Sequence, residues 1–112
     1  MSNSIERRKQ HRIQVRWPIT VLTDDGPIEG ETRNIAVDGV SICCEEPLPL
    51  NQIFHMRVSP PHHRTMEFTG KVIWSDQYAF DEQNSVFGMG ICLVKISDAD
   101  RHFFKDLVSA HP

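Results

Sequence analysis

The sequence predicts a mainly β protein, a six-stranded antiparallel β-barrel with one C-terminal α-helix. Two patterns lead to this fold class. Hydrophobic and polar residues alternate with a period of two in a series of short segments, which are separated by turn residues. Near the C-terminus the period becomes that of a helix. With 112 residues, of which 39% are hydrophobic and 24% charged, the chain has the size and composition of one soluble globular domain.

The first predicted strand follows a basic N-terminal arm and runs from residue 13 to residue 21. Every second position in it is hydrophobic, which is typical of a half-buried strand. The set comprises Ile13, Val15, Trp17, Ile19 and Val21. We assign Trp17 to the core. Pro18 cannot donate a hydrogen bond to a neighbouring strand, so an edge or a bulge is expected there.

Two turns frame the second predicted strand. Residues 24–27 (Asp-Asp-Gly-Pro) have turn chemistry, and Gly26 is expected to supply a positive φ. Residues 28–36 form the hairpin partner of the first strand, interrupted only at Gly30. Residues 37–39 (Val-Asp-Gly) make the second turn.

Four more strands complete the predicted barrel. Each has hydrophobic residues or glycine at alternate positions. The four sets are Val40, Ile42 and Cys44; Phe54, Met56 and Val58; Phe68, Gly70, Val72 and Trp74; and Phe87, Met89, Ile91 and Leu93. Residues 77–85 are predicted to be an exposed connection between the last two strands.

A short amphipathic helix is predicted at about residues 98–109. Ser97 is in the N-cap position, and Asp100 stands three residues on, as in a capping box. One helical face is hydrophobic and comprises Phe103, Phe104, Leu107 and Val108. We expect this face to pack across an open end or seam of the barrel as a structural plug.

The charge is unevenly distributed along the chain. Five of the twelve Lys and Arg residues lie in the first 16 positions with one acid, a net +4, and the remaining seven bases and 14 acids give −7. The five are Arg7, Arg8, Lys9, Arg12 and Arg16. A concentrated positive segment on an acidic protein favours a local anion site over a surface that follows a nucleic-acid polymer.

Several function classes find no support in the sequence. No hydrophobic run is long enough to span a membrane and the N-terminus lacks a signal sequence, so a cytoplasmic location is expected. Three cysteines, two of them adjacent, do not make a disulfide framework, and the six histidines have no metal-ligand spacing. We therefore expect no metal, no cofactor and no catalytic residue.

Two local motifs could bind an anion. Arg8 and Arg12 are separated by three residues just before the first strand, and residues 34–39 (Asn-Ile-Ala-Val-Asp-Gly) end the second strand and its turn. The Asn34 amide, displayed at the surface, can read a purine edge, and Gly39 permits a close backbone approach or a positive φ. We interpret the arm as a clamp that folds over this strand onto a planar, anionic ligand.

These motifs resemble the signatures RxxxR and [DN]xSxxG of the PilZ domain, the bacterial receptor for cyclic di-GMP. The likeness extends to residues 70–74 and 88–91, which are similar to the middle and last strands of that family. The resemblance implies a PilZ-like, split-barrel type of fold over residues 13–112, a flexible arm over residues 1–12, and no enzymatic activity. It also implies a stand-alone receptor that binds cyclic di-GMP, moves its arm on binding, and signals through an effector protein.

Carried over to this chain, the resemblance makes Arg8 and Arg12 the pair that binds guanine and phosphate. Asn34 then takes the base-edge contact, Gly39 allows the close approach, and Arg7 and Lys9 are either further phosphate contacts or solvated charges. The residue in the position of the signature serine is Ala36, which has no hydroxyl.

Several alternatives stay open at this stage. Asp38 places a negative charge near the expected phosphate. Trp74 either packs in the core or at the barrel rim, or faces the ligand and stacks on a guanine. Alanine in the position of the signature serine is also consistent with a second interpretation. In that interpretation the chain is a degenerate PilZ-like interaction module that acts in motility or pilus assembly and binds no nucleotide. Whether the protein is a monomer or a homodimer is left undecided.

Overall fold

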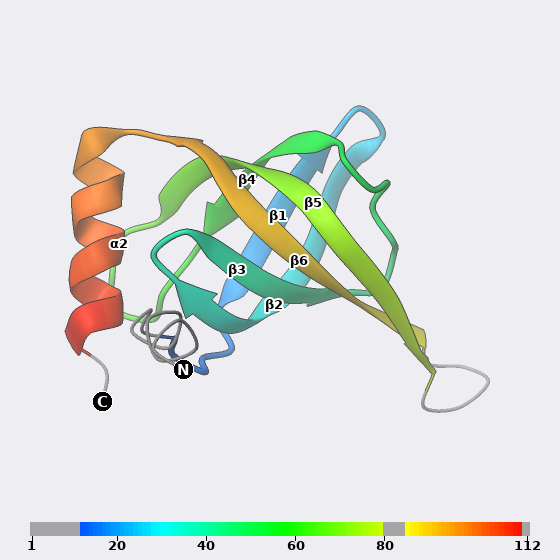
Figure 1. Cartoon of the computed structure of the whole chain (residues 1–112), viewed down its shortest axis with the longest axis horizontal. Helices are drawn as coiled ribbons and strands as arrows, with labels where there is room; N and C mark the ends of the chain where they lie inside the picture. The colour runs from blue at the N-terminus through cyan, green and yellow to red at the C-terminus, as the bar shows by residue number, and fades with distance from the viewer. Residues whose placement is uncertain (1–11, 80–84, 111–112) are drawn as a thin grey trace, which may run out of the picture.

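The computed structural model describes residues 12–79 and 85–110, which form a closed antiparallel β-barrel and one helix (Figure 1). Neighbouring strands follow the order β1-β2-β3-β6-β5-β4, and β1 closes the barrel by pairing with β4. The elements are β1 Pro18–Thr23, β2 Gly26–Ala36, β3 Gly39–Cys44, β4 Ile53–Val58, β5 Met66–Ala79, β6 Ser85–Ile96 and α2 Asp98–Ala110. The predicted fold class is confirmed.

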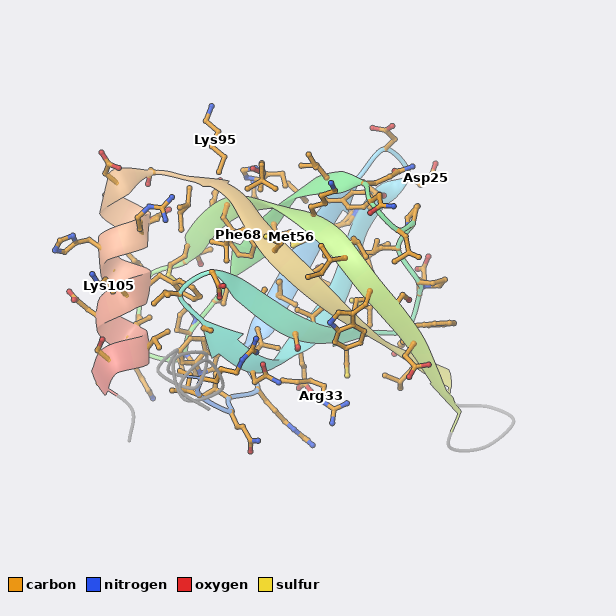
Figure 2. All side chains as sticks on the ribbon, viewed as in Figure 1. Asp25, Arg33, Met56, Phe68, Lys95 and Lys105 are labelled. Atoms are coloured by element: carbon orange, nitrogen blue, oxygen red, sulfur yellow. The ribbon has the colours of Figure 1, made fainter. Side chains whose placement is uncertain are left out.

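The barrel interior is filled by the alternating hydrophobic residues of the strands. Figure 2 shows Met56 and Phe68 inside the barrel, and Asp25, Lys95 and Lys105 extending away from it. The most completely buried large side chains include Ile19, Val21, Ile35, Ile42, Met56, Val58, Val72, Met89 and Ile91. Trp17 lies in this core, as the sequence predicts.

Helix α2 packs against one end of the barrel (Figure 1). Phe104, Leu107 and Val108 are buried in the common core, and Phe103 packs at its margin. Ser97 caps the helix, because its Oγ accepts a hydrogen bond from the Asp100 amide at 3.1 Å. Within the described residues, no helix is long and apolar enough to cross a membrane.

Some element boundaries differ from the prediction. The first strand begins at Pro18 rather than at residue 13, and the first residue of a strand is a position where proline is tolerated. β2 runs through Gly30 without interruption. The connection between β5 and β6 is shorter than predicted, because residues 77–79 and 85 belong to the two strands. The predicted arm lies outside the described residues except for Arg12.

The cysteines are free thiols, as expected for a chain without a disulfide framework. Burial, with smaller contributions from Cys43, Glu46 and Glu29, raises the pKa of the Cys44 thiol to about 12. Cys44 is therefore an inert core residue at neutral pH. In the part of the chain that the structure describes, no three His, Cys, Asp or Glu side chains gather into a metal-binding group.

The segment before β1 is held against β2 by backbone and side-chain hydrogen bonds. Ile13 and Ile35 exchange two backbone hydrogen bonds of 2.9 and 2.8 Å, and the Ile13 side chain is buried. Thr32, which has no exposed surface, accepts a hydrogen bond from the Trp17 amide at 2.9 Å and donates one to the Val15 carbonyl at 2.5 Å. These contacts determine where Arg12 leaves the barrel.

Replacing Thr32 by valine should lower the free energy of unfolding by about 1–3 kcal/mol, since a buried N–H and a partly buried C=O lose their partner without a change in shape. Denaturant titration followed by circular dichroism measures the change. Thr20→Val is the matched control, because the Thr20 hydroxyl donates to Glu29 on an exposed surface and its loss should cost under about 0.5 kcal/mol. Equal losses in the two variants would refute the anchoring role of Thr32.

Candidate ligand-binding cleft

A single row of residues crosses four neighbouring strands on the outer wall of the barrel. Asn34 of β2 pairs with Ser41 of β3, Ser41 pairs with Gly90 of β6, and Gly90 pairs with Trp74 of β5. Directly opposed residues in a sheet lie on the same face, so the four form a continuous floor. Three of them, with Arg12, border a cleft of about 110 Å³.

A β-bulge precedes each end of this row. The register shifts between Thr32 and Asn34 on β2 and between Val72 and Trp74 on β5. Without the extra residue, Asn34 would oppose a buried residue of β3 and Trp74 a buried residue of β6. The two bulges therefore turn an amide and an indole to the outer wall of the barrel.

Arg12 borders the polar end of the cleft, and Asn34 lies beside it as the hydrogen-bond partner of Arg12. Arg12 Nη1 donates a hydrogen bond to Asn34 Oδ1 at 2.7 Å, although 22 residues separate them in sequence. The Ile13–Ile35 bridge brings Arg12 to this place, because it fixes the next residue of the chain beside the end of β2. A guanidinium has five N–H donors, so one bond to Asn34 leaves capacity for an anionic ligand.

Trp74 forms the aromatic end of the cleft. Its side chain is 43% exposed and lies against Gly90, where an added Cβ would come within 2.5 Å of three indole atoms. Trp74 therefore does not pack in the core, because the β-bulge at Ile73 turns the Trp74 side chain to the outer wall of the barrel. An exposed indole face is a surface on which a planar ring can stack.

The turn between β2 and β3 borders the same cleft. Gly39 and Asp38 line it, and the Asp38 carbonyl accepts a hydrogen bond from the Leu93 amide at 3.0 Å. The possible positive φ at Gly39 is not found: among the described glycines only Gly26 has one, at 116°, as predicted for its turn. Gly39 is needed for close packing, since an added Cβ would lie 2.7 Å from the Ile91 carbonyl oxygen.

Ala36 does not line the cleft. Ala36 pairs with Gly39 at the end of β2 and has no exposed surface, whereas Asn34 is half-buried. Arg7, Arg8 and Lys9 lie outside the described residues.

Sequence reasoning missed Ser41 and Gly90 as parts of the site. Ser41 stands between the inward-facing Val40 and Ile42, so the alternation in β3 already indicates that it faces outward. Gly90 lies in a predicted strand, and no local pattern in the sequence marks it as part of a site. Its contact with Trp74 could not be expected, because the bulge at Ile73 has no glycine or proline signal.

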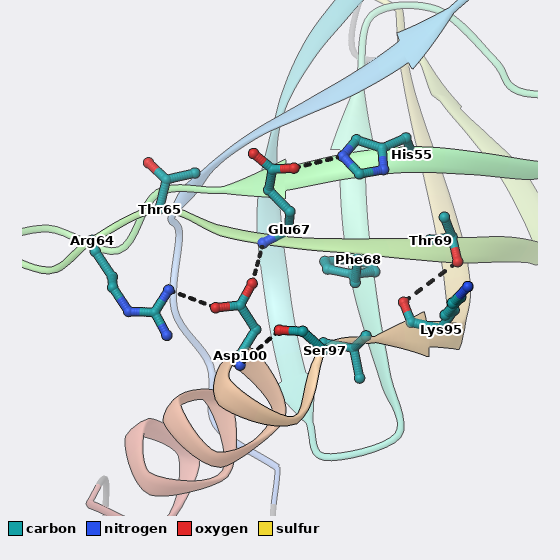
Figure 3. Close-up of a pocket in the computed structure, with 10 residues that line it drawn as sticks. His55, Arg64, Thr65, Glu67, Phe68, Thr69, Lys95, Ser97 and Asp100 are labelled. Carbon is teal, nitrogen blue, oxygen red and sulfur yellow. Dashed lines mark hydrogen bonds and ion pairs between the residues drawn. The ribbon is translucent and has the colours of Figure 1, made fainter.

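A larger hollow of about 520 Å³ lies where α2 meets β4, β5 and β6 (Figure 3). Apart from Lys95, the charged side chains and the imidazole that line it contact one another. Arg64 contacts Asp100 at 2.5 Å, and His55 contacts Glu67 at 2.8 Å. The Asp100 carboxylate also accepts a hydrogen bond from the Glu67 backbone amide at 3.2 Å, and this bond connects the helix to β5. These contacts favour a structural role for this hollow. We place the candidate site at the smaller cleft, which Arg12 and Trp74 border and beside which Arg12 is hydrogen-bonded to Asn34.

Gly90→Ala is expected to displace the Trp74 indole, because an added Cβ would lie 1.9 Å from Trp74 Nε1. The indole ¹H–¹⁵N resonance of Trp74 should shift, and that of the buried Trp17 should stay in place as an internal reference. Cys92→Ala is the control, since this side chain borders the same cleft and its truncation adds no atoms. An unmoved Trp74 resonance in Gly90→Ala would contradict this packing.

Comparisons with known proteins agree with the fold. The family model described as PilZ domain matches residues 6–110. The structure is similar to the PilZ domain of YcgR from Escherichia coli, solved with c-di-GMP, with a TM-score of 0.77 and 14% identity over 93% of this chain and 90% of that one. A comparison with curated proteins finds no match.

Two longer proteins contain a similar fold. MrkH of K. pneumonia, in its c-di-GMP complex, gives a TM-score of 0.78 at 12% identity over 92% of this chain and 51% of that one. The Bacillus subtilis inhibitor of motility MotI/DgrA gives 0.70 at 14% identity over 92% and 49%. This chain spans about half the length of each, and at these identities the likeness is one of fold.

Proposed function

The chain belongs to the PilZ domain family, and from that premise we propose that it is a receptor that binds cyclic di-GMP in the Arg12–Asn34–Trp74 cleft. The observation that carries the proposal is the 2.7 Å hydrogen bond between Arg12 and Asn34, beside an exposed tryptophan. It joins two motifs that are distant in sequence into one site. The structures of YcgR and MrkH with c-di-GMP support the choice of ligand.

The chemistry of the cleft suits a cyclic dinucleotide. Such a ligand has two planar guanines and two anionic phosphates. The Arg12 guanidinium can pair with a phosphate or with the O6 and N7 acceptors of guanine, and the Asn34 amide can donate and accept at a base edge. The exposed face of Trp74 can stack on a guanine ring.

The cleft alone is too small to enclose the ligand. Its volume of about 110 Å³ is below the roughly 300–1,000 Å³ of common small-molecule sites. The rest of the dinucleotide would be covered by residues 1–11, whose Arg7, Arg8 and Lys9 supply the positive charge that two phosphates need.

In this proposal, binding changes the position of the arm, and the changed surface is read by an effector protein. The protein acts by binding rather than by catalysis, in the cytoplasm.

A second candidate function is an interaction module that binds no nucleotide. The observation that favours it is Ala36, which is fully buried and has no hydroxyl to offer a ligand. The contact between Arg12 and Asn34 favours the receptor.

Calorimetric titration with cyclic di-GMP tests the receptor. Wild-type protein should bind saturably and more weakly at higher salt. Arg12→Ala should weaken binding roughly 10- to 150-fold, since a hydrogen bond to a charged group is worth about 1.5–3 kcal/mol. Arg57→Ala is the matched control: it removes the same charge from β4, where Arg57 contacts Glu67 at 3.4 Å, and should leave affinity unchanged. A folded wild-type protein that gives no heat would favour the interaction module.

Asp38→Asn should strengthen binding. Asp38 borders the cleft, and in this proposal its carboxylate lies near a ligand phosphate; removing one screened like charge is worth about 0.5–1 kcal/mol, or roughly two- to fivefold in affinity. Asp25→Asn, on the β1–β2 turn, removes the same charge outside the cleft and should have no effect. Weaker binding by Asp38→Asn would show instead that this carboxylate accepts a hydrogen bond from the ligand.

A further inference from the structure

Ser41 occupies the centre of the cleft floor. It stands between Asn34 and Gly90 in the cross-strand row and lines the cleft. Its inward neighbours Val40 and Ile42 are buried, while Ser41 is half-buried on the outer wall. Among the residues that the structure describes, its hydroxyl has no hydrogen-bond partner.

The row has a polar end and an aromatic end. Arg12 is attached to Asn34 at one end, and the Trp74 indole forms the other. Three inter-strand spacings of about 4.8 Å separate the backbones of these ends by roughly 14 Å. In a nucleotide the ribose joins the base to the phosphate. The indole itself covers Gly90, so a base stacked on Trp74 with a phosphate at Arg12 places the sugar–phosphate link over Ser41.

We propose that Ser41 is a further ligand-binding residue whose hydroxyl hydrogen-bonds the sugar–phosphate link of bound cyclic di-GMP. This inference rests on the proposed function. The Trp74 indole covers Gly90, so Ser41 supplies the side-chain hydroxyl between that indole and Asn34. A hydroxyl can donate a hydrogen bond to a phosphate oxygen, and it can donate to or accept from a ribose hydroxyl.

Ser41 has a side-chain hydroxyl that can bind a ligand, whereas Ala36 has none. Ala36 lies on the neighbouring strand at the turn, is fully buried and has no polar side-chain atom. The side-chain hydroxyl that the cleft presents to a ligand therefore comes from β3 rather than from the end of β2.

The test is calorimetric titration of cyclic di-GMP into wild-type protein, Ser41→Ala and Cys43→Ala, with Arg12→Ala as a reference for lost binding. Ser41→Ala should weaken binding roughly three- to tenfold, the range for one net hydrogen bond. Its melting temperature should not change, because the hydroxyl has no partner among the described residues. Cys43 is the next outward position on β3 and pairs with Gly88, beside the row. Its truncation should leave affinity within about twofold.

The outcomes separate the two proposals. Wild-type binding that Arg12→Ala weakens and Ser41→Ala leaves unchanged would overturn the role of Ser41 and leave the receptor standing. An equal loss in Ser41→Ala and Cys43→Ala would overturn it as well, because the effect would then not depend on the row. Absence of binding by folded wild-type protein would overturn both.

Discussion

The site depends on the attachment of residues 13–17 to β2. Two backbone hydrogen bonds join Ile13 to Ile35, and the buried Thr32 hydroxyl satisfies the Trp17 amide and the Val15 carbonyl. Buried backbone groups without partners are costly, so these bonds hold the segment in one register. Because Ile13 is fixed in the core, Arg12 can approach only the end of β2, where Asn34 lies.

The second requirement is irregularity in an otherwise regular barrel. Strict alternation would direct Asn34 and Trp74 inward, and one bulge on each of β2 and β5 turns them outward. Between them, Gly90 leaves room for the indole to lie against the barrel wall. The result is a short floor with a cation at one end and an aromatic ring at the other, built on strands rather than on loops. Such a floor is preorganised, so the strand residues that form it need little ordering when a ligand binds.

The predictability of each feature follows from its physical origin. The barrel, the core position of Trp17 and the Ser97 helix cap follow from local periodicity and cap chemistry, and the structure agrees with them. The direction of Trp74 depends on a register shift against β6, which is a tertiary property that no local pattern in β5 reveals. Gly39 likewise serves contact with Ile91, a residue far away in sequence. Ser41 was predictable from alternation alone, but its position opposite Asn34 required the register.

The most direct test of the account is an NMR titration of ¹⁵N-labelled protein with cyclic di-GMP. If the cross-strand row is the binding floor, the largest shifts should occur at the Trp74 indole, the Asn34 side-chain amide and the backbone amides of Ser41 and Gly90. Resonances around the hollow at His55, Arg64 and Asp100 should change little. Large shifts at that hollow with an unchanged Trp74 indole would contradict the account and place the ligand at the other end of β5.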